Sequence, residues 1–354
     1  MERNKDLSFF GRTMIPLRGQ NLEGLQNLFL SRHLPKYRAT QLAEWIYQKD
    51  AFSWEEVSTL PQPLRDVLSQ EYGLHSIQLE KKKASEDGSV KFLFQVDGGD
   101  YIEAVLIPTP KRKTLCISTQ VGCAVGCIFC ASGKDGFKRN LTPDEILDQV
   151  SYARRESAAP LTNIVFMGMG EPLLNFDHLI TSLTALTSSW GYGLSQRRIS
   201  VSTSGIVPKI EAFLNSGFNQ VKLCISLHAG NEELRTELVP INKKFSIQAL
   251  KDVVQRNRHK IKRDLTLEYT VIKEVNDRQS DAHELAAIAK ELKAKVNVIA
   301  YNPIPDVTLE RPEIQQIERF RDILEHQGVR ATVRYSAGND VSAACGQLRR
   351  IVKS

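Results

Sequence analysis

Three cysteines lie close together in the first half of the chain and are its strongest chemical signal. Cys123, Cys127 and Cys130 occur in the segment CAVGCIFC with C-x3-C-x2-C spacing. Three thiolates on one short loop can hold three irons of a 4Fe-4S cluster. The fourth iron is then free to chelate the amino and carboxylate groups of a ligand such as S-adenosylmethionine (SAM). The small residues between Cys123 and Cys127 let the backbone wrap around such a cluster.

Two other interpretations of these cysteines remain open at this point. Zinc usually takes four ligands, often as two spaced pairs. No histidine lies between Ser76 and Phe176, and Cys116 is the only nearby fourth thiol. The other interpretation is that the cysteines are incidental. In a reducing compartment, however, a tight group of cysteines favours metal or redox chemistry over disulfides.

The elements around this loop predict where it lies in the fold. Strands are expected at 115–119, 163–168, 198–203, 221–227, 265–272, 296–300 and 330–335, and helices at 143–155, 176–186, 207–215, 282–292 and 312–326. This alternation predicts a parallel sheet with right-handed crossovers. About six units fit a partial (β/α)6 barrel better than a full eight-fold barrel. The cysteine loop then follows the first strand, at the end of the barrel where active sites form.

The remaining parts of the chain are expected to differ from the barrel. Residues 1–75 look helical, and residues 76–113 are expected to form strands at 90–96 and 101–107. The apolar faces of the two expected N-terminal helices, 38–49 and 63–72, are Leu42, Trp45 and Ile46 in the first and Leu64, Val67 and Leu68 in the second. The sequence thus predicts an α/β protein with a helical domain at 1–75, a β extension at 76–113 and the barrel at 114–354.

Composition and charge argue against a membrane protein and favour a polyanionic partner. The longest apolar runs, near 164–168 and 223–227, are far too short to span a bilayer. The N-terminal MERNKDLSFF has no segment of signal-peptide length, so the cytoplasm is the expected compartment. The net charge is +6 and the pI is about 8.9. Basic runs occur at 81–83, 111–113, 134–139, 197–198, 243–244 and 256–263. Each run alone is usually solvated surface, but several around one cavity would form a track for phosphates.

Six segments together carry a family resemblance. CISTQVGCAVGCIFCASG, FMGMGEPLLN, STSGIVP, ISLHA, VPINKK and DVSAACGQL resemble the RlmN/Cfr family of RNA adenine methyltransferases, within the radical SAM superfamily. The segments appear in family order, and the resemblance runs from near Arg38 to Leu348. It implies a radical SAM barrel, one 4Fe-4S cluster held by Cys123, Cys127 and Cys130, and two SAM molecules per turnover. It also implies that the helical N-terminal domain binds RNA.

The resemblance assigns a SAM site at the ends of successive strands. The residues that match the family's SAM contacts are Gly170, Glu171, Ser202, Ser226, Leu227, His228 and Asn302. Glycine suits a point where the backbone must approach a ligand closely, and Glu171 could accept from an ammonium group or a ribose hydroxyl. Judged without the family, Glu171 would pass as a solvated loop acid, His228 as a satisfied barrel histidine, and Asn302 as a turn residue.

Two more cysteines and a glutamate take catalytic roles by resemblance alone. Cys345, in AACGQL, matches the cysteine that accepts a methyl group from a first SAM. A second SAM, cleaved at the cluster, gives a 5′-deoxyadenosyl radical that takes hydrogen from this methyl group, and the carbon radical adds to the base. Cys116 matches the cysteine that then attacks Cys345, leaving a transient disulfide and releasing RNA. Glu103 matches the acceptor of the ring proton.

Without the family, these three residues would look ordinary. Cys116 and Cys345 would be core thiols, since free cysteine is commonly buried. Glu103, in YIEAVLIP, would be a solvent-facing residue of an alternating strand. Cys224, in VKLCISLH, has no counterpart role and is expected to pack in the core.

The activity implied by the resemblance is methylation of carbon-2 of an adenosine in the peptidyl-transferase centre of 23S rRNA. The adenosine beside the tRNA anticodon is a candidate second substrate, and a flavodoxin-type electron donor is an expected partner. Within the family, the alternative is Cfr-like methylation of carbon-8. The segments PLLN at 172–175 and VPINKK at 239–244 favour the RlmN branch. The alternative from another class is a non-catalytic RNA-binding protein with a structural metal, which has no need of the GEP, SLHA and AACGQL segments.

Overall fold

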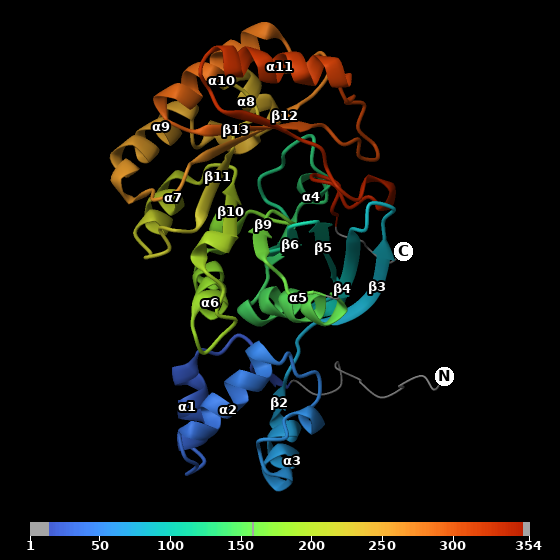
Figure 1. The fold of residues 1–354 in the computed structure, drawn as a ribbon, viewed down its shortest axis with the longest axis vertical. Helices are drawn as coiled ribbons and strands as arrows, with labels where there is room; N and C mark the ends of the chain where they lie inside the picture. The colour runs from blue at the N-terminus through green and yellow to red at the C-terminus, as the bar shows by residue number, and fades with distance from the viewer. Residues whose placement is uncertain (1–13, 158, 350–354) are drawn as a thin grey trace.

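A ten-stranded sheet organises the computed structural model, which describes residues 14–157 and 159–349 (Figure 1). Its strand order is β14-β13-β12-β11-β10-β9-β6-β5-β4-β3. Neighbouring strands from β14 to β6 are all parallel. These strands are β6 (Arg112–Ile117), β9 (Asn163–Phe166), β10 (Ile199–Thr203), β11 (Lys222–Ser226), β12 (Thr266–Val271), β13 (Lys295–Ala300) and β14 (Ala331–Arg334). The predicted α/β fold with a partial (β/α) barrel is confirmed.

A helical crossover joins each parallel strand to the next. The crossover helices are α5 (Pro143–Glu156), α6 (Phe176–Thr187), α7 (Val207–Leu214), α8 (Glu232–Leu238), α9 (Ile247–Arg256), α10 (Gln279–Glu291) and α11 (Ile314–His326). The start of α5 shows why the sequence folds this way locally. Thr142 and Glu145 form a capping box, and Pro143 occupies the first turn, where its missing N–H costs nothing. Buried apolar residues of α5, including Ile146 and Val150, face the core.

The β extension continues the barrel sheet with antiparallel strands. It consists of β3 (Gln78–Ala84), β4 (Val90–Gln95) and β5 (Tyr101–Thr109), and β5 pairs with β6. The strands expected at 90–96 and 101–107 are therefore present, and the first barrel strand begins at Arg112. Every residue from Tyr101 to Leu106 is buried, so β5 is covered on both faces. The division of the chain at 75 and 113 stays a prediction.

The N-terminal part is a small helical unit. It contains β1 (Ile15–Pro16), α1 (Leu22–Leu30), α2 (Tyr37–Ala43), α3 (Gln62–Glu71) and β2 (Tyr72–Gly73). The helix expected at 38–49 is α2 continued by a π-helical turn at Glu44–Gln48, with Leu42 and Ile46 buried and Trp45 partly buried. The apolar face predicted for 63–72 is wrong at Val67, which is 50% exposed. The helix α3 packs against β2 and Trp54–Glu56. These contacts bury Leu68 and leave Val67 in solvent.

A buried ion pair joins the N-terminal unit to the barrel. Arg18 Nε lies 2.7 Å from Asp148 Oδ1 of α5, and both side chains are fully buried. Asp148 also accepts hydrogen bonds from the Ser76 N–H at 2.6 Å and from the His75 ring at 3.0 Å. These contacts give the helical unit a fixed position beneath the barrel (Figure 1).

No helix in the described ranges is long and apolar enough to cross a bilayer. The opening segment MERNKDLSFF, on which the expectation of no signal peptide rests, lies outside the described residues.

Candidate active site

The clustered cysteines lie on the loop between β7 (Gln120–Gly122) and α4 (Ala131–Lys134), close after β6; β7 itself pairs with β8 (Phe137–Asn140). Burial raises the pKa of all three thiols, that of Cys123 to about 12. The pKa of Cys127 is raised further by its neighbours Cys130 and Cys123. The thiolate forms that bind metals therefore need strong compensation by positive charge, which iron ions supply.

The spacing of the three thiols bears on which metal they fit. Within residues 14–157 and 159–349, no group of three or more His, Cys, Asp or Glu side chains could hold a single metal ion. Cys127 is close enough to Cys130 and Cys123 for each to raise its pKa, so the three thiols form one group on the loop. A structural zinc usually takes four ligands, whereas three thiolates that each bind a different iron suit a cluster with one open iron.

Arg235 of α8 places a buried positive charge near the cluster loop. Its guanidinium donates to the Leu227 carbonyl at 3.1 Å, the Ser204 carbonyl at 2.7 Å and Asn242 Oδ1 at 2.6 Å. Burial lowers its pKa to about 10, and Cys127 is close enough to act in the opposite direction. In the part of the chain that the structure describes, Arg235 forms no ion pair with a carboxylate. It is therefore a cation suited to an anionic cluster.

Gly170 and Glu171 follow β9 and are held by Gln120. Gly170 has φ 98°, and a Cβ there would lie 2.5 Å from Gln120 Cβ. Glu171 is fully buried, unlike a solvated loop acid: one oxygen accepts from the Leu173 N–H at 3.0 Å, and the other accepts from the Ser204 N–H at 2.6 Å and hydroxyl at 2.8 Å. Burial raises the pKa of Glu171. A ligand at this carboxylate would share it with Ser204.

The next predicted SAM residues lie at the ends of β10 and β11. The hydroxyls of Ser202 and Ser226 are 3.3 Å apart on the lumen side of neighbouring strands. Leu227 is buried, and its N–H donates to the Glu268 carbonyl at 3.0 Å. These three residues form one continuous patch at the carboxyl ends of the strands.

His228 has a defined protonation state. Its Nδ1 accepts from the Thr270 N–H at 3.0 Å, which leaves the ring proton on Nε2. Burial and the nearby Arg235 lower its pKa to about 3, so the ring is neutral. Its edge-on contact with Phe129, at 4.7 Å between ring centroids, fixes the ring against the cluster loop.

The segment that carries Cys345 folds over the cluster loop. The Ala131 N–H donates to the Gly346 carbonyl at 2.7 Å. Asn302, which follows β13, donates to Ser336 Oγ at 2.8 Å and to the Cys345 carbonyl at 3.1 Å. Asn302 is therefore more than a turn residue, because its amide holds the backbone of Cys345.

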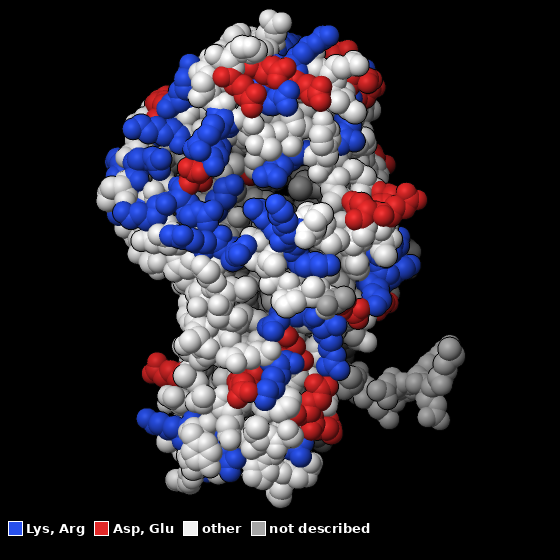
Figure 2. Space-filling view, in the orientation of Figure 1, with Lys and Arg blue, Asp and Glu red and all other residues white. Residues whose placement is uncertain are grey.

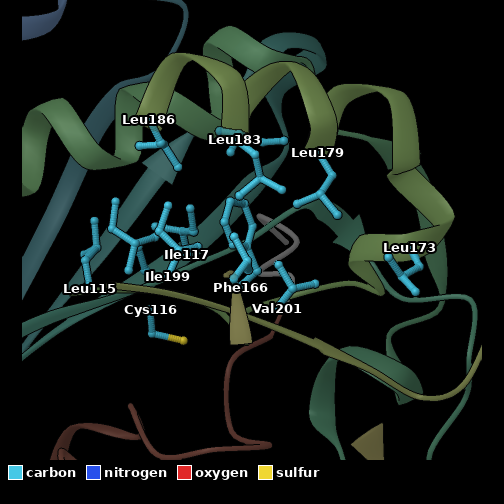
Figure 3. Close-up of a cluster of buried hydrophobic side chains, with 14 of the residues drawn as sticks. Leu115, Cys116, Ile117, Phe166, Leu173, Leu179, Leu183, Leu186, Ile199 and Val201 are labelled. Carbon is cyan, nitrogen blue, oxygen red and sulfur yellow. The ribbon is translucent and has the colours of Figure 1, made fainter. Parts of the chain in front are cut away.

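Cys116 is the last residue but one of β6 and lies between two core residues, Leu115 and Ile117. Figure 3 shows Leu115 and Ile117 pointing toward the leucines of α6, while Cys116 points to the opposite side of the sheet. Cys116 and Cys345 line one cavity, and the charge of Cys345 adds to burial in raising the pKa of Cys116. Burial also raises the pKa of Cys345, to about 11, although solvent reaches this residue through the cavity.

Glu103 is buried, contrary to its interpretation as a solvent-facing strand residue. Only 2% of it is exposed, and its carboxylate lies 2.9 Å from Lys91 Nζ and accepts from the Arg349 N–H at 3.1 Å. It shares a face of β5 with Val105, which is paired with Cys116. Its carboxylate thus lies on the same side of the sheet as Cys116, in contact with the C-terminal segment.

A cavity of about 1040 Å³ occupies the barrel lumen. Cys116, Cys130 and Cys345 line one end of it. The amino ends of the strands line the other with basic residues: Arg112, Arg197, Arg198, Lys262 and Arg263. None of the described residues that are predicted to contact SAM lines this cavity. They lie at or just after the carboxyl ends of the strands.

Several of the basic runs noted in the sequence meet at this cavity. They are 111–113, 197–198 and 256–263, and Figure 2 shows Lys and Arg side chains gathered over the region where Figure 1 draws α7, α9 and β11. Residues of two other runs are paired with carboxylates instead: Lys82 with Glu156, and Arg139 with Glu145. Only part of the predicted basic charge therefore faces the cavity.

Sequence reasoning missed a set of polar residues inside the lumen. Lys222, Cys224, Glu268, Asn297 and Arg334 all line the cavity. Cys224 is buried as expected, but it faces the lumen and not the apolar core. The signal that could have found this set is a polar residue at every second position of a strand that is otherwise apolar, as in LTLEYTV.

Comparison with known proteins identifies the family. Residues 117–286 match the radical SAM superfamily, and residues 15–73 match the ribosomal RNA large subunit methyltransferase N-terminal domain. The dual-specificity RNA methyltransferase RlmN of Marinomonas sp. (strain MWYL1) is 43% identical over 94% of this chain and 92% of its own. The enzyme of the same name from Francisella tularensis subsp. novicida is 41% identical over the same shares.

A solved structure agrees with these sequence matches. The crystal structure of a radical SAM methyltransferase from Sphaerobacter thermophilus covers 95% of this chain and 99% of its own, with 42% identity and a TM-score of 0.92. A SAM-dependent RNA methyltransferase activity and an iron–sulfur cluster follow from these relationships. The chain belongs to the RlmN family of radical SAM RNA methyltransferases.

Proposed function

We propose that this enzyme methylates carbon-2 of an adenosine in the peptidyl-transferase centre of 23S rRNA, and also the adenosine beside the tRNA anticodon. The observation that carries the proposal is the shared cavity of Cys116 and Cys345, two thiols far apart in sequence, beside the cluster loop. Two relatives more than 40% identical to this chain are named dual-specificity RNA methyltransferases, which supports the second substrate.

The proposed site has separate holders for the two cofactors. Cys123, Cys127 and Cys130 bind one 4Fe-4S cluster, which supplies an electron for the cleavage of SAM to a 5′-deoxyadenosyl radical. The residues proposed to hold SAM are Gly170, Glu171, Ser202, Ser226, Leu227, His228 and Asn302. Among them, neutral His228 offers an Nε2–H donor, and Asn302 connects this site to the backbone of Cys345.

Cys345, Cys116 and Glu103 carry the proposed steps on the protein. The Cys345 sulfur would accept a methyl group from a first SAM. After that methyl group loses a hydrogen atom to a second, cleaved SAM, Cys345 would present a carbon radical to the base. The Cys116 thiolate would then attack the Cys345 sulfur, forming a disulfide as the carbon–sulfur bond to the product breaks. The released carbon would take a proton from solvent, and the unpaired electron of the adduct would return to the oxidised cluster. Glu103 takes the proton lost from the ring, and Lys91 Nζ lies 2.9 Å from its carboxylate. An external reductant, such as a flavodoxin, restores the two thiols.

The test is anaerobic reconstitution with SAM, a reductant and 23S rRNA or tRNA, followed by mass spectrometry of digested RNA. The expected product is 2-methyladenosine from both RNAs. A main product of 8-methyladenosine would move the site to Cfr-like chemistry. Unmodified tRNA beside modified rRNA would remove the second substrate. We place the reaction in the cytoplasm, where reduced thiols and an electron donor are available.

A further inference from the structure

Glu268 is a buried carboxylate on the lumen side of β12. It is 6% exposed and lines the cavity together with Cys116 and Cys345. Its charge is close enough to Cys345 to raise the pKa of that thiol. The resemblance and the steps proposed above give Glu268 no role. An acidic side chain at this depth carries a desolvation cost that a purely structural position does not require.

Neighbouring strands hold the Glu268 side chain in one orientation. Asn297 Nδ2 of β13 donates to Glu268 Oε1 at 2.9 Å, and the Cys224 thiol of β11 is hydrogen-bonded to the same carboxylate. The Glu268 carbonyl accepts from the Leu227 N–H at 3.0 Å. The carboxylate is therefore fixed by partners on both sides and faces the open lumen between them.

The charged groups around Glu268 are cationic. Lys222 of β11 and Arg334 of β14 both act on it electrostatically, and Arg334 Nε lies 3.5 Å from Asn297 Oδ1. Burial raises the pKa of Glu268, and the cations and hydrogen bonds act in the opposite direction. Because a carboxyl group has an acceptor oxygen in either protonation state, its ability to accept a hydrogen bond does not depend on this balance.

We propose that Glu268 selects the target base, by accepting a hydrogen bond from the exocyclic amine of adenine while the reacting carbon faces Cys345. The proposal rests on the proposed methylation of adenosine. Guanine carries a carbonyl oxygen where adenine carries this amine, so with an ionised Glu268 it would place two acceptors against each other. Uracil also carries a carbonyl oxygen in place of the amine, and cytosine is a smaller base, so it would not bring its amine to Glu268 and a reacting carbon to Cys345 as adenine does.

The test compares two RNA substrates that differ by one group. One carries adenosine at the target position, and the other carries purine riboside, in which hydrogen replaces the exocyclic amine. The measured quantity is the ratio of kcat/KM for the two RNAs, by competition and mass spectrometry. We expect the wild-type enzyme to prefer adenosine by about 5- to 150-fold. Glu268→Leu should lower that preference to the level set by the intrinsic reactivities of the two bases. Glu268→Gln keeps an acceptor oxygen and should retain most of the preference.

A matched control separates base selection from a structural role. Thr266 lies two residues before Glu268 on the same face of β12, is fully buried, and its hydroxyl has no hydrogen-bond partner among the described residues. Thr266→Val should leave the preference for adenosine unchanged. A merely structural loss would lower kcat/KM for both RNAs by the same factor and leave their ratio unchanged. The intrinsic difference in reactivity between the two bases is the same for every variant, so it cancels when the variant's ratio is divided by the wild-type ratio.

Each outcome decides the proposal. Equal use of both RNAs by the wild-type enzyme, or the same preference in Glu268→Leu as in the wild type, would overturn it. If Glu268→Leu does not fold, Glu268→Ala removes the same oxygens with less bulk, and methylation of Cys345 serves as the check on its fold. Failure of the proposed function looks different, because the wild-type enzyme would then form no methyladenosine from the adenosine RNA.

Discussion

Removing the charge of Asp148 should destabilise the attachment of the N-terminal unit to the barrel. In Asp148→Asn the shape of the side chain is kept, but Arg18 loses its partner at 2.7 Å in a fully buried site. Breaking a buried pair by removing one partner typically costs about 3–5 kcal/mol, because a buried charge is left without compensation. Asp50 remains 3.8 Å from Arg18, so we expect a loss near the lower end, about 3 kcal/mol. That is a large share of a typical unfolding free energy of about 5–15 kcal/mol.

The assay is urea unfolding followed by tryptophan fluorescence. The chain has three tryptophans. Trp45 and Trp54 lie in the N-terminal unit, and Trp190 packs edge-on against Tyr47 with 5.4 Å between ring centroids. The fluorescence therefore reports on this unit and its contact with the barrel.

Glu310→Gln is the matched control for burial. The Lys273–Glu310 pair has the same 2.7 Å separation, but both side chains are exposed, so its loss should not measurably shift the transition. Replacing both buried charges, in Arg18→Met with Asp148→Leu, should restore part of the stability lost in the single variant. Equal midpoints for Asp148→Asn and Glu310→Gln would show that burial does not govern the strength of this pair.

Three further predictions concern charge, cluster and thiols. Burial alone would raise the pKa of Asp148, but His75 and Arg18 more than offset it, so the pKa in the folded protein is lowered. The difference in unfolding free energy between the wild type and Asp148→Asn should therefore be complete above a pH of about 4 and shrink as the pH falls through the folded pKa. Urea titrations at a series of pH values measure this difference. Cys127→Ala should reduce bound iron from about four per chain to less than one and abolish SAM cleavage, and iron retained at the wild-type level would contradict the ligand assignment. Cys116→Ala should accumulate a protein–RNA conjugate that survives denaturing gels and disappears after nuclease treatment, while Cys345→Ala should give neither conjugate nor methylated protein; normal turnover by Cys116→Ala would end the two-thiol mechanism.

The order of strands and helices could be predicted from the sequence because each barrel strand is a short apolar run between helical stretches. The cysteine loop could also be predicted, because its three cysteines lie close together in the sequence. The faces of residues were harder to predict. Cys116 stands between Leu115 and Ile117, and only the pairing of β6 with both β5 and β9 determines that it points into the lumen.

Long-range partners account for what the sequence could not show. Glu171 is held by Ser204 from another strand end, and Glu103 by Lys91 and the backbone of the C-terminal segment. Such contacts join residues that no periodicity connects. The lumen position of Glu268 was hidden in a similar way, because a polar residue in a strand reads as exposed unless the sheet is known to close into a barrel.

The cluster loop and its surroundings should make the two ends of the barrel differ in local stability. Before a cluster is inserted, the carboxyl end of the strands holds the hydrogen-bonded Arg235 cation next to buried thiols whose ionisation is disfavoured. Ligand-binding loops belong to the less stable parts of a fold, and they open more often than its core. We expect amide hydrogen exchange in the cluster-free protein to be fastest around α8 and the cysteine loop, and to slow there once the anionic cluster binds. During maturation, the amino end of the barrel would then be formed first, and the carboxyl end around the cluster would become rigid last.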